Sequence, residues 1–430
     1  MNFLKKTSNY FKEHKINSWM AFFIIIYIVL VLKLTTLKEI DNNIFFGTYS
    51  LLVSFYILSR FGLAYFYEPV KATFNKNYEP TISFAVPSKN EEENIRETII
   101  RIAQTDYPKN KFNIIVINDG STDKTLKEML SAKKIASKMG VEVIVVDWKV
   151  NKGKREGMAE CIKRSNKEIM IFIDSDSFVE KDTAKELVKY FSDKKVSAVS
   201  GHTYVANADK NVLTRMQAVK YYVAFKAYKS AEAIFGTVTC CSGCCAAYRR
   251  SHLIKVLDKW LNQKFLGVKC TYGDDRSLTN SLLNKGYIAL YAPEAKAHTF
   301  VPENFKQYIK QQLRWKKSWF RESLRAGSYM WKRNPIMTIS FYLGFILPLI
   351  APIVVFRALI WYPYNTHLLP WVYLLGLMLM AVIYGLYYYI HTFDNKWPYA
   401  VLFATFYTLA LVWQLPWAIL NLRESSWGTR

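Results

Sequence analysis

Hydrophobic residues follow two different patterns along the chain, and the change between the patterns divides the chain into parts. Toward both ends they form long, nearly unbroken apolar blocks, whereas in the middle they form short runs separated by polar stretches. An apolar helix needs about 20 residues to cross the hydrocarbon core of a bilayer, and a strand needs only about five or six. The pattern therefore predicts membrane helices at both ends and a folded polar domain between them.

The apolar blocks near the ends each have about the length of one membrane crossing. They cover residues 18–34, 44–67, 337–361, 368–390 and 397–422. A cleavable signal peptide is the alternative for the first block, but no small-residue cleavage site follows it and a second block comes at once. We therefore interpret both N-terminal blocks as membrane helices.

The middle of the chain alternates between strand-like and helix-like segments. Strands are predicted at residues 81–86, 113–117, 141–146 and 168–173, and helices at 91–103, 123–138 and 154–164. This alternation indicates an α/β domain with a largely parallel sheet. Ligands of such sheets bind beyond the carboxyl ends of the strands. The polar clusters of the domain lie there, at residues 87–91, 118–122 and 174–176.

The segment 305–331 mixes lysine and arginine with aromatic residues, just before the C-terminal apolar blocks. This pattern fits helices that lie in the membrane interface. An amphipathic helix on the surface of the polar domain is the alternative, and the apolar blocks that follow favour the interface.

The chain of 430 residues has a formal net charge of +24, which raises nucleic-acid binding as a candidate function. However, Lys and Arg cluster beside the apolar blocks, and the tendency of positively charged segments to stay in the cytosol explains this placement more simply. We therefore expect a membrane protein whose N-terminus and polar domain are cytosolic, without a nucleic-acid partner.

All of the six cysteines lie in the polar part of the chain, and Cys241 and Cys244 form a C-x-x-C pair. A zinc site would need a second pair or suitably spaced histidines, which the sequence lacks. A redox pair is a weaker alternative to small, reduced thiols that line a packed turn.

Two carboxylates, Asp174 and Asp176, follow the predicted strand 168–173. Side chains at i and i+2 of a strand end point to the same side. There they can hold a divalent cation against a diphosphate, because Mg²⁺ usually takes one or two carboxylates together with phosphate oxygens. The spacing alone is common by chance, and its place at a strand end strengthens the interpretation.

Three further motifs each allow a functional and a structural interpretation. Asp119, in a Gly-containing turn, is suited to accept from a uracil N–H, or it caps the helix after Thr122. The basic turn 151–155 suits phosphate at a helix start, or it is a solvated turn. In the motif 273–276, an Asp beside an Arg suits a general base, or it forms a salt-bridged loop.

In this order, the motifs resemble those of the family 2 inverting glycosyltransferases, specifically the processive hyaluronan synthase and chitin synthase branch. The motifs are Val86-Pro-Ser-Lys-Asn-Glu-Glu92, Asn118-Asp-Gly-Ser121, Gly153-Lys-Arg155, Asp174-Ser-Asp176, Ser242-Gly243, Gly273-Asp-Asp-Arg276, Gln311-x-x-Arg-Trp315 and Trp427-Gly-Thr-Arg430. The resemblance is clearest over residues 80–330.

The resemblance implies a GT-A-type nucleotide-sugar transferase domain inserted between transmembrane helices, with interfacial amphipathic helices. The boundaries expected are 1–74 for the N-terminal helices, 75–300 for the transferase domain, 301–334 for the interfacial helices, 335–422 for the C-terminal membrane region and 423–430 for a tail. It also implies Mg²⁺ or Mn²⁺ as cofactor, and UDP-sugars, a growing polysaccharide and the lipid bilayer as partners. The location implied is the plasma membrane, with both termini and the transferase domain cytosolic.

Carried over position by position, the resemblance implies these roles. Asp275 is the catalytic base and Asp176 the metal ligand. The substrate-binding residues implied are Pro87, Glu91, Asp119, Lys154, Arg155 and Asp174 at the nucleotide, Ser242 and Gly243 at the acceptor sugar, Arg276 beside the base, Gln311, Arg314 and Trp315 at the acceptor and diphosphate, and Trp427 and Arg430 closing over bound UDP.

Departures from the family motifs leave the product open. Cys244 and Cys245 stand where hyaluronan synthases usually have Pro-Leu, and the run 246–250 is like the chitooligosaccharide synthases. The motif 273–276 resembles hyaluronan synthases instead, and we favour hyaluronan over a chitin-like polymer. A non-processive transferase acting on a lipid phosphate would not need the motifs at 311–315 and 427–430. A basic membrane scaffold leaves the acidic motifs unexplained.

The number of crossings constrains the C-terminal blocks. If Trp427 and Arg430 reach the nucleotide, the chain must end on the side of the transferase domain, which requires an even number of C-terminal crossings. Three blocks are visible, so one must lie in the interface, re-enter or split. Pro348 and Pro352 predict a break in the first block, and Pro416 predicts one in the third.

Overall fold

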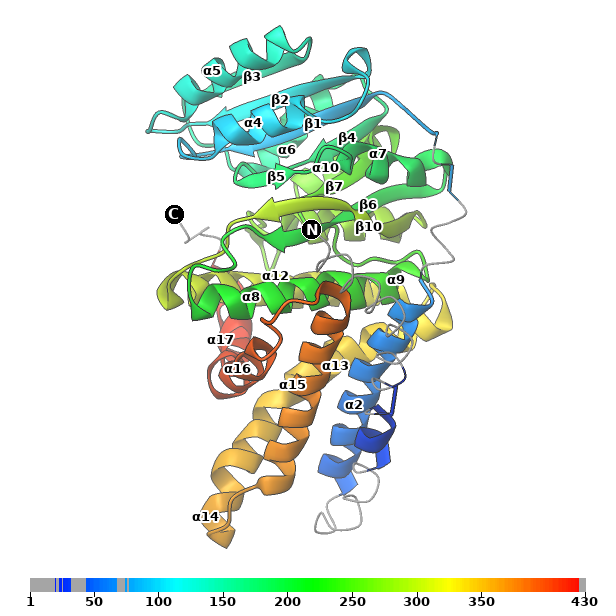
Figure 1. Cartoon of the computed structure of the whole chain (residues 1–430), viewed down its shortest axis with the longest axis vertical. Helices are drawn as coiled ribbons and strands as arrows, with labels where there is room; N and C mark the ends of the chain where they lie inside the picture. Colours follow the sequence, from blue (N-terminus) through cyan, green and yellow to red (C-terminus); the bar gives the residue numbers. More distant parts are fainter. Residues whose placement is uncertain are drawn as a thin grey trace, which may run out of the picture.

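The computed structural model describes residues 20, 23–24, 26–31, 44–67, 74–75 and 77–424. Figure 1 shows three levels along the long axis of the molecule. The sheet domain lies at the top, helices α8 and α12 run crosswise beneath it, and helices α2, α13 and α15 extend downward. The cavity described below lies between the first two levels.

The four predicted strands are confirmed and lie next to one another in one eight-stranded sheet. They are β1 (Ile82–Ser88), β2 (Phe112–Asp119), β3 (Glu142–Trp148) and β4 (Ile169–Phe172), in the order β3-β2-β1-β4, and all are parallel. The helices that connect them are α4 (Ile95–Ala103), α5 (Thr125–Lys138) and α6 (Lys154–Arg164). β1 and β2 are buried at every position, which is typical of parallel strands covered on both faces.

The other half of the sheet is mixed: β6 and β10 pair in parallel, whereas the remaining pairs are antiparallel. The sheet continues β4-β7-β6-β10-β5, with β5 (Ser177–Val179), β6 (Val196–Val205), β7 (Ala246–Arg249) and β10 (Ile288–Thr299). β7 is antiparallel to both β4 and β6, and β5 is antiparallel to β10. The chain therefore reverses direction after β4, at the turn that contains Asp174 and Asp176.

Two long helical stretches separate the sheet from the apolar helices. The first comprises α8 (Val212–Val223), the π-helical segment η3 (Ala224–Lys229) and α9 (Ser230–Ala233). The second, α12 (Phe305–Met330), is one continuous helix over the basic and aromatic segment. It begins at Asn304, whose side chain accepts from the Gln307 N–H at 2.9 Å, as an N-cap residue does.

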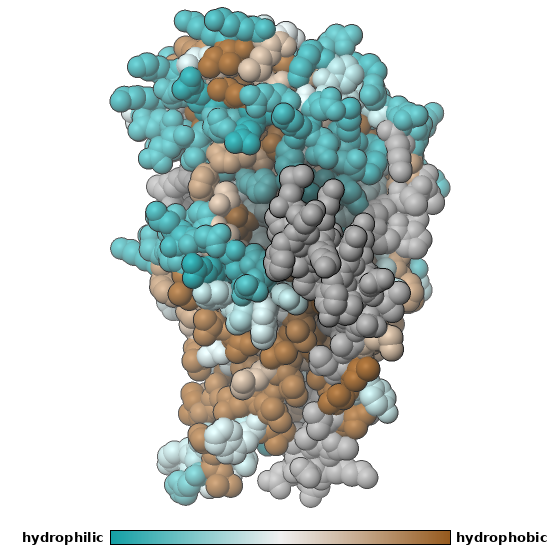
Figure 2. All heavy atoms as spheres, in the orientation of Figure 1, coloured by the Kyte–Doolittle hydropathy of each residue, from teal (hydrophilic) through white to brown (hydrophobic). Residues whose placement is uncertain are grey.

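Among the residues that the structure describes, three helices are long and apolar enough to cross a membrane: α2 (Ile44–Tyr65), the stretch Pro335–Thr366 and α15 (Trp371–Thr392). Figure 2 shows hydrophobic residues gathered over the lower helices and hydrophilic residues over the sheet domain. The sheet domain is therefore placed between an N-terminal and two C-terminal candidate spans. Of the first apolar block, 18–34, the structure describes residues 20, 23–24 and 26–31, and the crossing of this block stays a prediction.

The prediction that Pro348 and Pro352 break the first C-terminal block is wrong. Both lie inside α13 (Pro335–Phe356), and the helix continues through the π-helical segment η4 (Arg357–Trp361) and α14 (Tyr362–Thr366). A proline removes one helical hydrogen bond, and a membrane helix tolerates this loss where neighbouring helices pack on it. α2 and α12 supply that packing here.

The third block is bent, as expected from Pro416. It consists of α16 (Tyr399–Phe406), the π-helical segment η5 (Tyr407–Leu411) and α17 (Gln414–Leu420), with a bend of 44° between Leu411 and Gln414. Pro416 lies in the first turn of α17, where a missing N–H costs little. α16 packs on α8 and α17 on α12, and both lie directly beneath the crosswise helices (Figure 1).

The chain then returns to the sheet domain. The hydroxyl of Tyr272 donates to the backbone carbonyl of Glu424 at 3.0 Å. The last residues that the structure describes therefore lie on the same side of the apolar helices as the sheet domain, which is the position that an even number of C-terminal crossings requires.

Two glycines with positive φ allow a test of how closely the turn after β2 packs against residues 150–151. Gly120 (φ +63°) follows β2, and a Cβ there would lie 2.5 Å from the backbone N of Asn151. Gly140 (φ +75°) follows α5 and has open space around it. We expect Gly140→Ala to lower the free energy of unfolding by about 1–2 kcal/mol, the cost of a left-handed alanine. Gly120→Ala should cost clearly more, because the backbone at residues 150–151 must also move.

Thermal unfolding of the detergent-purified variants measures this difference. Equal melting temperatures for the two variants would contradict the close approach of the two turns.

Candidate active site

A cavity of about 1480 Å³ lies between the carboxyl ends of the strands and the helices α8 and α12. It extends to Tyr56 on the candidate membrane helix α2. Every predicted site residue that the structure describes lines it: Pro87, Glu91, Asp119, Lys154, Arg155, Asp174, Asp176, Ser242, Gly243, Asp275, Arg276, Gln311, Arg314 and Trp315. Trp427 and Arg430 lie outside the described residues.

The acidic pair lies in the turn after β4. The Asp174 carboxylate forms an ion pair with Lys154 and accepts a hydrogen bond from the Cys244 thiol at 3.5 Å. A Cβ on Gly243 would lie 3.0 Å from Asp174 Oδ1, so the loop at residues 242–244 approaches the carboxylate as closely as a glycine allows. The acidic pair and the Ser-Gly motif therefore form one wall of the cavity.

The acidic pair has the properties of a site for a hard cation. Burial and the neighbouring charge of Asp174 raise the pKa of Asp176 to about 6. A divalent cation would offset the repulsion between two such carboxylates. No group of three or more His, Cys, Asp and Glu with metal-binding geometry occurs among the described residues. Asp174 and Asp176 thus fit an ion that takes its other ligands from phosphate oxygens and water.

Asp119, at the end of β2, holds the basic loop in place. Its Oδ1 accepts from the Lys152 N–H at 2.6 Å and its Oδ2 from the Gly153 N–H at 2.9 Å. It does not cap the next helix, because Asp123 accepts from Thr125 at the start of α5. Carboxylate oxygens accept more than one hydrogen bond, so a role toward a uracil N–H stays a prediction.

The motif 273–276 contains two carboxylates with different surroundings. Asp274 is buried and pairs with the guanidinium of Arg155, with 2.8 Å between Nε and Oδ1. Arg155 also donates to the backbone carbonyl of Trp260 at 3.0 Å. Asp275 is half-buried and faces the cavity, and the Cys240 thiol lies 3.6 Å from its Oδ2.

The guanidinium of Arg155 therefore binds groups of the protein itself. A direct contact between Arg155 and the nucleotide stays a prediction. Both neighbouring carboxylates line the cavity, and Asp275 is the less buried of the two. Asp274 stabilises the start of α11 (Asp274–Asn284), because a buried carboxylate needs a paired cation.

α12 presents Gln311, Arg314 and Trp315 to the cavity, at positions i, i+3 and i+4 of one helical face. Burial lowers the pKa of Arg314, and the carboxylates of Asp174, Asp274 and Asp275 oppose this shift. The guanidinium therefore lies within the field of both acidic motifs. Trp315 is 38% exposed, and its ring lies 6.2 Å from that of Tyr221 on α8.

Lys229 is a cavity residue that the sequence did not reveal. Its ammonium donates to the hydroxyls of Ser242 at 2.6 Å and Ser200 at 2.7 Å, and lies 3.9 Å from the centre of the Phe225 ring. It lies in the π-helical segment η3, and such segments often occur at functional sites. No motif marks it, because the segment 212–233 reads as an ordinary helix.

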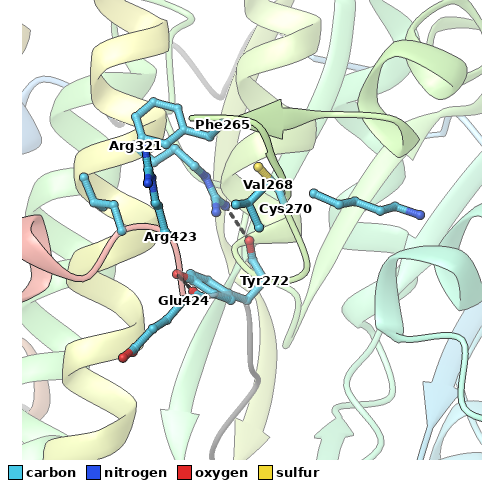
Figure 3. Close-up of a pocket in the computed structure, with 9 residues that line it drawn as sticks. Phe265, Val268, Cys270, Tyr272, Arg321, Arg423 and Glu424 are labelled. Atoms are coloured by element: carbon cyan, nitrogen blue, oxygen red, sulfur yellow. Dashed lines mark hydrogen bonds between the residues drawn. The ribbon is translucent and has the colours of Figure 1, made fainter.

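The end of the described chain packs beside the cavity (Figure 3). Leu422, Arg423 and Glu424 line a small pocket together with Tyr272 and Arg321. The Glu424 carboxylate lies 2.5 Å from the Lys317 ammonium on α12, and Arg321 donates to the Tyr272 carbonyl at 2.5 Å. Tyr272 immediately precedes the motif 273–276, so residues 422–424 contact the loop that leads to the predicted base.

A GT-A-like α/β sheet with acidic residues at its switch of direction, placed between apolar helices, defines a nucleotide-sugar glycosyltransferase. The chain belongs to glycosyltransferase family 2, since residues 80–318 match the family model described as "Glycosyltransferase like family 2".

Two relatives illustrate the range of that family. The chain is 33% identical to a hyaluronan synthase of Streptococcus pyogenes over 296 residues, 68% of this chain and 69% of that protein. It is 34% identical to an N-acetylglucosaminyltransferase of Azorhizobium caulinodans over 248 residues, 57% of this chain and 62% of that protein.

The fold is also similar to a solved structure, the mannosyltransferase PcManGT from Pyrobaculum calidifontis in complex with GDP-Man and Mn²⁺. The TM-score is 0.55 at 20% sequence identity, covering 84% of this chain and 99% of that chain. This likeness shows that the fold is shared.

The pKa of Asp176 predicts how the stability of the metal-free protein depends on pH. A folded-state pKa of about 6 lies above the ordinary value of 3.8, so the folded protein binds more protons than the unfolded chain between these values. In EDTA, the melting temperature should therefore fall as the pH rises from about 4 to 6, and level off above 6. Asp176→Asn should reduce this fall and raise the melting temperature at pH 7.5.

Asp258→Asn, at an exposed position, is the matched control. If the parent protein and the Asp176→Asn variant have the same dependence of melting temperature on pH in EDTA, the pKa of Asp176 is not raised in the folded protein.

Proposed function

We propose that the protein is a membrane-embedded, processive β-glycosyltransferase that polymerises UDP-GlcNAc and UDP-GlcA into hyaluronan and moves the polymer across the membrane. The observation that carries the proposal is the continuous cavity, which joins the acidic motifs to Tyr56 on the candidate span α2. The similarity to a hyaluronan synthase supports the choice of product.

In this proposal, Pro87, Glu91 and Asp119 surround the nucleotide, and Lys154 and Arg314 bring positive charge to the diphosphate. Asp174 contacts the UDP and Asp176 holds Mg²⁺ or Mn²⁺. When bound, the ion neutralises charge on the leaving diphosphate. The solved structure that shares the fold was obtained with Mn²⁺, which supports a divalent cation.

Asp275 acts as the general base. It takes the proton of the acceptor hydroxyl while the oxygen of that hydroxyl forms a bond to the anomeric carbon of the donor sugar. The bond from this carbon to the diphosphate breaks, UDP leaves, and the configuration inverts. Arg276 lies beside the base, Ser242 and Gly243 border the acceptor, and Gln311 and Trp315 hold it.

Aromatic side chains mark a route from the site toward the membrane helices. Trp315, Trp319, Tyr228 and Tyr56 line the cavity. Tyr228 is hydrogen-bonded to Tyr384 of α15. Flat rings that bind through van der Waals contact and ring stacking suit a polymer that must slide, because they hold it without fixing one register.

The runner-up function is a chitin or chitooligosaccharide synthase that uses UDP-GlcNAc alone. The Cys244-Cys245 pair and the similarity to an N-acetylglucosaminyltransferase favour it. Against it stand two lysines that line the cavity and form no ion pair with the described carboxylates, Lys220 and Lys316. A neutral polymer has no counter-charge for them.

The orientation that we propose is that of a multi-pass plasma-membrane protein with the transferase domain and both termini in the cytosol. UDP-sugars are then taken from the cytosol. The return of the chain to Tyr272 supports a C-terminus on the side of the transferase domain.

The product distinguishes the two functions. Purified protein with Mg²⁺ should make a polymer only when both UDP-GlcNAc and UDP-GlcA are present, and hyaluronidase should digest it. A polymer that forms from UDP-GlcNAc alone, and that chitinase digests, would establish the runner-up. EDTA should abolish either activity, and full activity in EDTA would refute the metal site.

Asp275→Asn tests the base. We expect polymer synthesis to fall by about 10²–10⁴-fold, the usual contribution of a positioned general base, with UDP binding nearly unchanged. Asp274→Asn is the informative comparison, because it leaves the buried Arg155 unpaired and should lower the folded yield as well. Near-normal synthesis by Asp275→Asn would remove the assignment.

The tail is tested by charge reversal. Trp427 and Arg430 are proposed to close over bound UDP, and the Lys317–Glu424 pair sets where the tail starts. Glu424→Lys should raise the KM for the UDP-sugar about tenfold, and adding Lys317→Glu should restore part of the loss. Deleting residues 427–430 should lower catalysis more than folded yield.

Glu79→Lys, which disrupts the surface pair with Lys111, is the control. Full activity of the deletion, or a C-terminal tag labelled from outside intact cells, would refute the lid and the orientation.

A further inference from the structure

Two lysines that line the cavity form no ion pair with any carboxylate that the structure describes. Lys220 of α8 and Lys316 of α12 both line the cavity and are close enough for their charges to repel each other. Among the described residues, neither forms an ion pair with Asp or Glu. Their hydrogen bonds go to neutral acceptors: Gln312 Oε1 at 2.8 Å for Lys220, and the Leu411 carbonyl and Gln414 Oε1 for Lys316.

This arrangement is electrostatically costly without a bound anion. Burial lowers the pKa of Lys220 to about 8, and burial together with the charge of Lys220 lowers that of Lys316 to about 7. Both lysines are half-buried, and like charges in a partly buried site are stabilised when an opposite charge joins them.

The buried amide of Gln312, beside the lysines, has a donor without an acceptor in the described part of the chain. Gln312 is 5% exposed, and its Oε1 accepts from Lys220. Its Nε2 has no hydrogen-bond partner among the residues that the structure describes. A buried donor without an acceptor destabilises the fold by about 1–3 kcal/mol. A single bound acceptor could therefore stabilise both lysines and the Gln312 amide.

The surroundings indicate what kind of molecule carries the acceptor. The Lys220 ammonium lies 5.6 Å from the centre of the Trp315 ring and 5.9 Å from that of Tyr308. Trp315 is the predicted platform for the acceptor sugar, and the same cavity contains Asp275. A cation beside an aromatic platform suits a sugar ring that bears a carboxylate better than the phosphate of a lipid, whose chains would have to leave the cavity.

We propose that Lys220, Lys316 and the Gln312 amide form a subsite that binds the carboxylate of an acidic sugar in the acceptor chain. The subsite rests on the proposed function and deepens it, since it would select an acidic over a neutral acceptor. It lies beside the acceptor platform, Trp315, in the same cavity as the proposed donor residues.

The test compares two labelled hexasaccharides on detergent-purified full-length protein by fluorescence polarisation. One alternates GlcA and GlcNAc, and the other contains GlcNAc alone. Lys220→Met and Lys316→Met should each weaken binding of the acidic hexasaccharide on the order of 10- to 100-fold, the loss expected for a charged hydrogen bond. Binding of the neutral hexasaccharide should change less than twofold.

Three further variants guard against a general loss of folding. Lys220→Arg keeps the charge and should retain binding of the acidic hexasaccharide. Gln312→Glu keeps the size, neutralises Lys220 and should reproduce the selective loss. Lys310→Met, on the exposed face of α12, is the matched control and should change neither affinity.

An equal loss for both hexasaccharides, or no loss for either, would overturn the subsite. Anionic-lipid dependence that Lys220→Met removes, with sugar binding intact, would assign the lysines to a phosphatidylglycerol headgroup and also overturn it. If the parent protein makes hyaluronan while the variants bind normally, the subsite alone fails. If the parent protein makes only a chitinase-sensitive polymer and does not bind the acidic hexasaccharide, the proposed function fails with it.

Discussion

Two consecutive basic residues at the start of α6 hold the acidic motifs of the site together. Lys154 pairs with Asp174 after β4, and Arg155 pairs with Asp274 at the start of α11. Charges away from water are stable only when they are paired and hydrogen-bonded. The two ion pairs therefore hold the turn after β4 and the start of α11, which are distant in sequence, against the first turn of α6. The place of Asp275 in the cavity follows from this, because its neighbour Asp274 is fixed in the interior.

Residues that are adjacent in sequence can have different roles once a helix starts. Lys154 and Arg155 carry the same charge and both resemble nucleotide ligands, yet successive helical positions differ by about 100° in direction. One side chain reaches the cavity carboxylate, and the other packs on Trp260 in the interior. The same division separates Asp275 from Asp274. Which side chain points into the cavity and which into the interior depends on the oppositely charged residue that each one pairs with. A sequence motif does not contain this information.

Periodicity predicted β1 to β4 and the helices between them, because each element there is local and its neighbours in sequence are its neighbours in space. The mixed half of the sheet was not predictable in this way: β7 enters between β4 and β6 after the long excursion through α8. Site residues at strand ends were found from their position. Lys220 and Lys229 were not, because their roles depend on what α12 and the loop at Ser242 bring to them. Prolines predicted the bend before α17 but not the continuity of α13, since neighbouring helices decide whether a proline bends a helix.

The contact between Tyr272 and Glu424 has a consequence for biogenesis. Leu422–Glu424 reach the loop of the predicted base only after α13 to α17 have taken their places beneath the sheet domain. Before the C-terminal helices have entered the bilayer, residues 422–424 are not yet in contact with the loop at Tyr272. Under the proposed function, polymer synthesis is thereby tied to completed membrane insertion of α13 to α17.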